Sequence, residues 1–204
     1  MEEEINNNYA EISGILTRLP RISHENRGER FYIFPVAVRR LSGTLDTVNV
    51  IAREKLLIGL GLSEGVSLHI FGQLRSFNNK SDQGAKLVIS LFARSLVMEP
   101  CEDRNDILLH GTICKQPNLR ITPMGREICD FMLAVNRRYG RSDYLPCIAW
   151  GAKARQVAHY DVGTTIALSG RIQSRQYIKL IDDIPNEKTA YEVSVIDLEK
   201  TGKK

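Results

Sequence analysis

The chain has 204 residues, 43% of them hydrophobic and 25% charged, and a net charge of +4. This is the composition of an ordinary folded protein with room for two small domains, and its mildly basic charge is compatible with a polyanionic partner. No apolar run approaches the roughly 18 residues that cross a membrane, and the acidic start Met1–Glu4 lacks the features of a secretory signal, so we expect a cytoplasmic protein.

The first half of the chain predicts five strands and one short helix. Hydrophobic and polar residues alternate with the period of a half-buried strand, and turn-forming residues separate the runs. In chain order the expected strands are Tyr9–Arg18, Phe31–Arg40, Asp46–Ala52, Val66–Phe77 and Ala85–Val97, with a helix at Arg53–Gly61.

The second half predicts the same elements in the same order. A loop containing Pro117, Pro123 and Gly125 follows its first strand, and a polar loop at Asp182–Lys188 precedes its last. The expected strands are Ile107–Lys115, Ile128–Arg138, Tyr144–Trp150, Thr165–Gln176 and Thr189–Asp197, with a helix at Ala152–His159.

The two halves also match residue by residue at a spacing of 97 positions, which becomes 98 after a one-residue insertion. This repeat predicts two domains of one fold, residues 1–100 and 101–204, joined near Met98–Arg104. The matching pairs are Gly14 and Gly111, Gly28 and Gly125, Phe34–Val38 and Phe131–Val135, Arg40 and Arg137, Asp46 and Asp143, Ile51-Ala52 and Ile148-Ala149, Gly65 and Gly163, Gly72 and Gly170, and Ser76 and Ser174.

Five strands with one helix between the third and fourth are typical of a small Greek-key barrel, the OB-fold. A βαβ architecture would need a helix after nearly every strand. We therefore predict an all-β protein with two tandem OB-fold barrels of five strands, each with a short helix between strands 3 and 4.

Residue parity predicts which side chains fill the second barrel. The expected core positions are Ile166, Leu168, Gly170 and Ile172 in the fourth strand, and Leu145, Cys147 and Ala149 in the third. The third strand should then point Tyr144, Ile148 and Trp150 outward. A large aromatic side chain that stays in water does not gain the free energy of burial. Outward positions for such residues therefore indicate a ligand that covers them.

The stretch from Cys129 to Gly151 interleaves aromatic and basic residues. Cations attract phosphates and ring faces stack on bases, so this pattern favours an unpaired nucleic-acid strand. The candidate residues of the second half are Tyr139, Tyr144, Trp150, Tyr177, Arg137, Arg138, Arg171 and Arg175. The competing interpretation is structural: a lone tryptophan is usually core, loop tyrosines often only face solvent, and arginines are common surface charge.

The first half lacks the same rings. Thr47, Arg53 and Asn79 stand where Tyr144, Trp150 and Tyr177 stand in the second half. Its candidate nucleic-acid contacts are Arg39, Arg40, Arg53 and Arg75. We expect this half to support assembly, to add a weaker stretch of the binding path, or both.

The second half resembles the bacterial single-stranded DNA-binding proteins, the SSB family. The resemblance covers nearly all of residues 101–204, and the first half looks like a diverged copy. The matching residues are Asn105, Gly111, Pro117, Thr122–Gly125, Phe131–Tyr139, Tyr144, Cys147–Gly151, Ala154, Val157-Ala158, Val162-Gly163, Gly170-Arg171, Ser174–Tyr177 and Thr189–Val193.

The resemblance implies non-sequence-specific binding of single-stranded DNA in replication, recombination or repair, near the bacterial nucleoid. It implies base stacking at Tyr139, Tyr144, Trp150 and Tyr177, and a homodimer with four OB domains. Members of the family usually end in an acidic tail that recruits other proteins. Because this chain stops at Thr201–Lys204, which is short and basic, we expect no such tail.

One alternative function stays open at this stage, and the sequence does not favour another. An OB-fold replication accessory or scaffold would bind mainly proteins or RNA. The small number of candidate stacking residues in the first half favours this alternative. An enzyme would need a carboxylate pair, a metal-ligand cluster, a phosphate loop or a nucleophile elbow, and the sequence contains none of these patterns. The four cysteines form no Cys-x-x-Cys pair. We therefore predict no catalysis, no cofactor and no metal.

Overall fold

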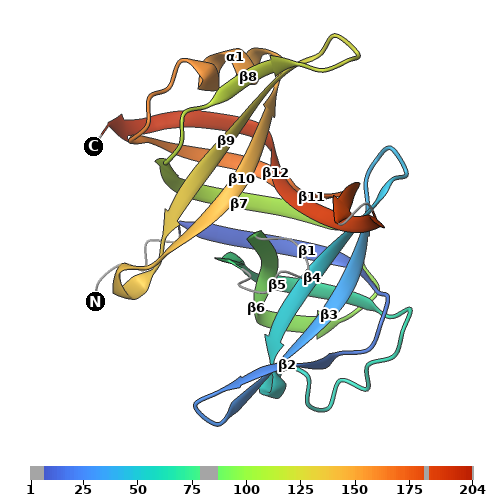
Figure 1. Ribbon diagram of the computed structural model, residues 1–204. Coiled ribbons are helices and arrows are strands. Elements are labelled where there is room, and N and C mark those ends of the chain that lie inside the picture. Colours follow the sequence, from blue (N-terminus) through green and yellow to red (C-terminus); the bar gives the residue numbers. More distant parts are fainter. Residues whose placement is uncertain (1–6, 79–86, 182–183, 204) are drawn as a thin grey trace. The chain divides into compact units, whose positions relative to one another are not determined.

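The computed structural model describes residues 7–78, 87–181 and 184–203 (Figure 1). Contacts between Cα atoms divide the chain into two units. The N-terminal unit comprises residues 10–106 and 173–191, and the C-terminal unit comprises residues 1–9, 107–172 and 192–204. In the part of the chain that is described, no helix is long and apolar enough to cross a membrane.

The barrel of the N-terminal unit has five strands in the order β3-β4-β6-β5-β1, and pairing of β1 with β3 closes it. Strands β4 and β6 run parallel, and the other paired neighbours are antiparallel. A short strand, β2 (Arg21–Asn26), forms a hairpin with β3. The barrel strands are β1 (Asn8–Leu16), β3 (Glu29–Arg39), β4 (Leu45–Arg53), β5 (Ser67–Asn78) and β6 (Leu87–Met98).

The second barrel repeats this topology in the order β7-β11-β12-β10-β9, closed by β7 and β9. Strand β8 (Asn118–Ile121) pairs with β9, and helix α1 (Ala152–Ala158) lies between β10 and β11. The barrel strands are β7 (Arg104–Ile113), β9 (Glu127–Asn136), β10 (Ser142–Trp150), β11 (Thr164–Ile181) and β12 (Ile184–Lys203). The all-β architecture and the position of the helix confirm the predicted fold class.

One pair of glycines that the repeat preserves, Gly14 and Gly111, lies where two backbones approach closely. A Cβ on Gly14 would lie 2.2 Å from the Ala37 carbonyl oxygen, and one on Gly111 would lie 2.5 Å from that of Ala134. Both positions are where the barrel closes, β1 against β3 and β7 against β9. Only a residue without a side chain fits this backbone approach.

The predicted core positions are buried, including Phe34, Leu145, Cys147, Ile166 and Leu168. The outward prediction for Ile148 was wrong, because its side chain is only 4% exposed. Parity gives the side of the strand on which a residue lies but not how far that side is covered. Pairing with β9 and β12 occupies the two edges of β10, so the cover over Ile148 comes from side-chain packing.

Three local predictions were also wrong. Instead of a helix over Arg53–Gly61, the chain forms one 3-10 turn, η1 (Glu54–Leu56), because Gly59 and Gly61 take positive φ values of 80° and 59°. Strand β8 lies within the predicted loop of the second half, and strand β2 was not predicted. Strand β12 begins at Ile184, so the predicted polar loop is mostly strand, and its residues 182–183 lie outside the described part of the chain.

Candidate nucleic-acid interface

Strand β10 carries two outward aromatic side chains. Parity places Tyr144 and Trp150 on the face opposite Leu145, Cys147 and Ala149, which fill the barrel. Tyr144 is 49% exposed and Trp150 is 40% exposed, as predicted. Six residues of strand separate them by about 20 Å. The pair therefore offers two ring faces along one extended path.

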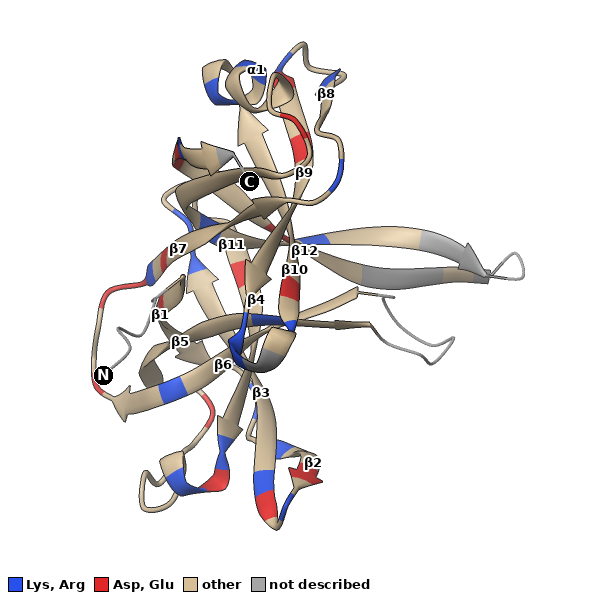
Figure 2. Ribbon diagram, turned by 90° about the vertical axis from the view of Figure 1, so that its left-hand side faces the viewer, with Lys and Arg blue, Asp and Glu red and all other residues tan. Residues whose placement is uncertain are grey.

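The turn between β9 and β10 gathers basic residues (Figure 2). It contains the short helix η2 (Arg138–Gly140) and the exposed side chain of Arg138. The backbone of Tyr139 lies in this helix, and its side chain lies outside the described part of the structure. The turn places positive charge beside the first residues of β10, near Tyr144.

Arg137 has a structural partner in this turn. Its guanidinium donates two hydrogen bonds to the carboxylate of Asp143, which is fully buried. Arg40 and Asp46 form the same pair in the N-terminal unit, with N–O distances of 2.6 Å for both bonds. Each arginine thus neutralises a buried charge, a role that competes with the predicted phosphate contact.

Arg171 lies half-buried on the outer face of β11. Its Nε is buried and has no hydrogen-bond partner among the described atoms. A buried donor without a partner costs free energy, and an incoming anion would supply the missing acceptor. This makes Arg171 a stronger phosphate candidate than its sequence position alone indicated.

The remaining candidates belong to the N-terminal unit and make several local contacts. The Arg53 guanidinium lies 3.4 Å from a carboxylate oxygen of Glu29 and 5.9 Å from the Phe92 ring centroid. Arg75 donates to the Gln73 side chain. The backbone N–H of Arg39 donates to the Asp103 carboxylate, while the Arg39 side chain is exposed.

Arg175 and Tyr177 are on the hairpin formed by β11 and β12, in its part that belongs to the N-terminal unit. Arg175 is exposed and Tyr177 is half-buried. The structure therefore brings Tyr144, Trp150, Arg137, Arg138 and Arg171 together in one unit. It assigns Arg39, Arg40, Arg53, Arg75, Arg175 and Tyr177 to the other.

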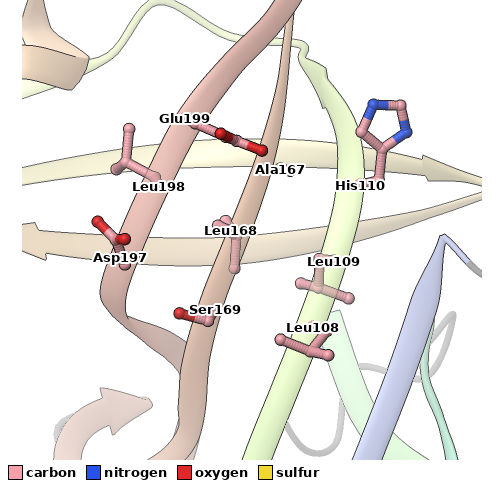
Figure 3. Close-up of a pocket in the computed structure, with 9 residues that line it drawn as sticks. All are labelled: Leu108, Leu109, His110, Ala167, Leu168, Ser169, Asp197, Leu198 and Glu199. Carbon is pink, nitrogen blue, oxygen red and sulfur yellow. The ribbon is translucent and has the colours of Figure 1, made fainter.

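A pocket of about 350 Å³ lies on the C-terminal unit among β7, β11 and β12 (Figure 3). Its described lining contains the carboxylates of Asp197 and Glu199 and includes neither lysine nor arginine. Leu108, Leu109 and Leu168 supply apolar surface there. Asp197 is paired with Lys153, which lies outside this lining, and Glu199 adds a second carboxylate. A lining with two carboxylates disfavours phosphates, so this pocket is separate from the candidate interface.

Burial disfavours the thiolate form of two cysteines, Cys129 and Cys147. Burial raises the pKa of Cys129 to about 11 and raises the pKa of Cys147 further still. All four cysteines are free thiols. Among the described residues, no group of three or more His, Cys, Asp or Glu side chains is placed to hold a metal ion. The outward rings and arginines are thus the features of these barrels that point to a ligand.

Fold and surface together define a tandem OB-fold protein with an aromatic and basic strand face. Residues 104–200 match the profile described as the Single-strand binding protein family. This part of the chain is therefore similar to the members of that family.

Named relatives agree with the family match. A "Single-stranded DNA-binding protein" of Clostridium tetani is 39% identical over 80 residues, which are 36% of this chain and 55% of that protein. "Single-stranded DNA-binding protein A" of Bacillus subtilis is 35% identical over 80 residues, 36% of this chain and 46% of that protein. The chain spans about half the length of the curated relatives that it matches.

A solved structure matches almost the whole chain. The crystal structure of the wild-type single-stranded DNA binding protein from Thermus aquaticus superposes with a TM-score of 0.78 at 21% identity. The match covers 97% of this chain and 94% of that one. At this identity the likeness establishes the shared fold.

Proposed function

We propose that this protein binds single-stranded DNA without sequence specificity and coats it during replication, recombination or repair. The observation that carries the proposal is the pair Tyr144 and Trp150, both outward on β10 and both about half exposed. Stacking of one base on one such ring contributes about 1–3 kcal/mol and tolerates any base. The family match of residues 104–200 supports the same ligand.

The proposed contacts follow the residue types. Tyr139, Tyr144, Trp150 and Tyr177 stack on bases, and arginines contact phosphates. Arg138, Arg171 and Arg175 are the main phosphate contacts, because Arg137 and Arg40 are already bound to buried carboxylates. Arg39, Arg53 and Arg75 extend the path on the N-terminal unit. The binding involves no chemical step and no cofactor.

Fluorescence of Trp150, the chain's single tryptophan, tests the proposal directly. Oligo-dT should quench it at low salt, and added salt should reverse the quenching because bound phosphates release counterions. Tyr144→Ala should weaken binding by about tenfold or more, the free energy of one stacked base, while Tyr144→Phe keeps the ring and most of the affinity. Absence of both quenching and a mobility shift at low salt would refute the proposal.

We also propose that two chains associate, so that a homodimer presents four OB domains, and that the protein acts in the bacterial cytoplasm at the nucleoid. The mass of the protein in solution, measured with and without oligo-dT, tests the assembly. A monomer under both conditions contradicts it. Competition between matched DNA and RNA oligomers separates the two possible ligands.

A further inference from the structure

The buried carboxylate of Asp46 has partners beyond Arg40. The backbone N–H of Ser174 donates to Asp46 Oδ1 at 2.7 Å, and the Ser174 hydroxyl approaches the same oxygen at 3.2 Å. Asp46 and Ser174 belong to the same unit although they lie 128 positions apart. A charged acceptor held by an arginine and by a backbone N–H is a strong attachment point.

The edge of β4 supplies the next contact. The backbone N–H of Thr47 donates to the Ser174 hydroxyl at 3.1 Å. Among the described residues, β4 pairs with β6 at Val50 and Ile51, so Thr47 precedes that pairing. An unpaired strand edge exposes donors that need acceptors, and Ser174 supplies one here.

A third contact fixes the other arm of the hairpin. The Asn49 side-chain amide donates to the Tyr191 hydroxyl at 3.0 Å. Burial raises the pKa of Tyr191, and the negative charge of Asp46 raises it further. Ser174 lies on β11 and Tyr191 on β12, so β4 holds both arms through three nearby residues.

Strand geometry then determines which way the hairpin faces. Alternate residues of a strand point to opposite sides. Because the Ser174 side chain points toward β4, Arg175 and Tyr177 point to the opposite side. The side chain of Arg175 is exposed, in agreement with this orientation.

The repeat adds an independent observation. Thr47 stands at the position that Tyr144 occupies in the second copy. The ring that stacks in the second copy is absent from the first, and the hairpin is attached at that point instead. The hairpin carries its own ring and cation, Tyr177 and Arg175.

We propose that Asp46, Thr47 and Asn49 form a hairpin seat, and that this seat positions Arg175 and Tyr177 as the strand-facing groups of the N-terminal unit. The residues of the seat are positioning residues and act on DNA through the hairpin. This inference rests on the proposed function, because it assumes that the ligand is single-stranded DNA.

The test uses the full-length chain carrying Ser174→Ala and Tyr191→Phe. These changes remove the hydroxyls that contact the seat and leave Arg175, Tyr177 and the Arg40–Asp46 pair in place. The matched control is Tyr160→Phe, which removes the hydroxyl that accepts a hydrogen bond from Gln156 in the C-terminal unit. Asn49→Ala, which disrupts the seat from the other side, is a second variant.

Two measurements are made on each protein. The first is amide hydrogen exchange of residues 173–191, which should become about tenfold faster when the hydroxyl contacts are lost. The second is affinity for oligo-dT of roughly 16 and 32 nucleotides, the upper site sizes for one and two OB folds. Affinity for the longer oligomer should fall about tenfold, with a smaller change for the shorter.

The outcomes separate cleanly. If hydrogen exchange of residues 173–191 is unchanged in both the double variant and Asn49→Ala, the hairpin seat does not exist. If exchange becomes faster but the affinity for the longer oligomer is unchanged, the seat does not position the hairpin for binding. If the unaltered chain fails to bind oligo-dT, the proposed function fails, and the role of the hairpin in binding fails with it. An equal loss in Tyr160→Phe contradicts the inference, since that variant leaves the seat intact.

Discussion

Replacing Asp143 by Asn tests the buried ion pair that both copies share. Asp143 is fully buried, whereas Arg137 keeps 25% of its side chain exposed. Removing one partner of a fully buried pair costs about 3–5 kcal/mol, and the partial exposure of Arg137 places this case near the lower limit, about 3 kcal/mol. An Asn amide also turns a donor toward the guanidinium, which cannot accept it.

Urea unfolding followed by Trp150 fluorescence measures this cost, because the tryptophan lies in the same unit as the pair. With a slope of about 2 kcal/mol/M, the midpoint should fall by about 1.5 M. Asp46→Asn is the matched change in the other unit. It should lower the urea midpoint measured by circular dichroism and leave the midpoint measured by Trp150 fluorescence unchanged. A cost below about 0.5 kcal/mol for Asp143→Asn would refute the reasoning, since it is the size of an ordinary surface change.

A double-mutant cycle with Arg137→Met shows whether the cost belongs to the pair. Residues that interact directly give coupling energies of about 0.5–3 kcal/mol, while independent residues add. Additive effects would mean that Asp143 is stabilised chiefly by other groups. A coupling energy near the upper end of this range would mean that the loss of stability comes from the two hydrogen bonds between Arg137 and Asp143.

Three further predictions follow from other parts of the structure. Gly111→Ala should destabilise the C-terminal unit by about 1–3 kcal/mol through the clash with Ala134 O, and a Trp150 urea transition at the unaltered midpoint contradicts this. Arg138→Gln should reduce the slope of log affinity against log salt by about 0.7, the value for one lost phosphate contact on a single strand, and an unchanged slope excludes that contact. Tyr191 has a folded pKa above its ordinary value of 10.0, so its stabilising effect is present below that pH and lost as pH rises through the folded value. Difference absorbance between the unaltered chain and Tyr191→Phe should show this tyrosine ionising late, and ionisation at the ordinary value contradicts it.

Much of the fold could be predicted because alternation and turns are local signals. The positions of Tyr144 and Trp150 followed from parity, since β10 is a regular strand with one covered face. The burial of Ile148 did not follow from parity, because alternation shows which side of the strand a residue occupies and not what packs on that side. All residues of strand β2 are exposed, so its sequence shows no alternation of hydrophobic and polar residues from which a strand could be predicted.

The candidate site was harder to predict than the fold. The recurrence of Arg40 and Asp46 as Arg137 and Asp143 was visible in the sequence, and two charges of opposite sign retained in both copies are a signal for an ion pair. Both copies also retain a serine, Ser76 and Ser174, but nothing in the sequence pairs Ser174 with Asp46, because the two residues lie 128 positions apart. Contacts of this kind become visible only when strands are placed side by side.

The hairpin seat has a consequence for the history of this chain. A duplication first yields two self-sufficient halves, either of which can be deleted or can drift alone. Here a carboxylate inherited by one half is satisfied by a serine inherited by the other. Loss of the hydroxyl at position 174 removes one contact from the buried carboxylate at position 46, so the two halves no longer vary independently at this point.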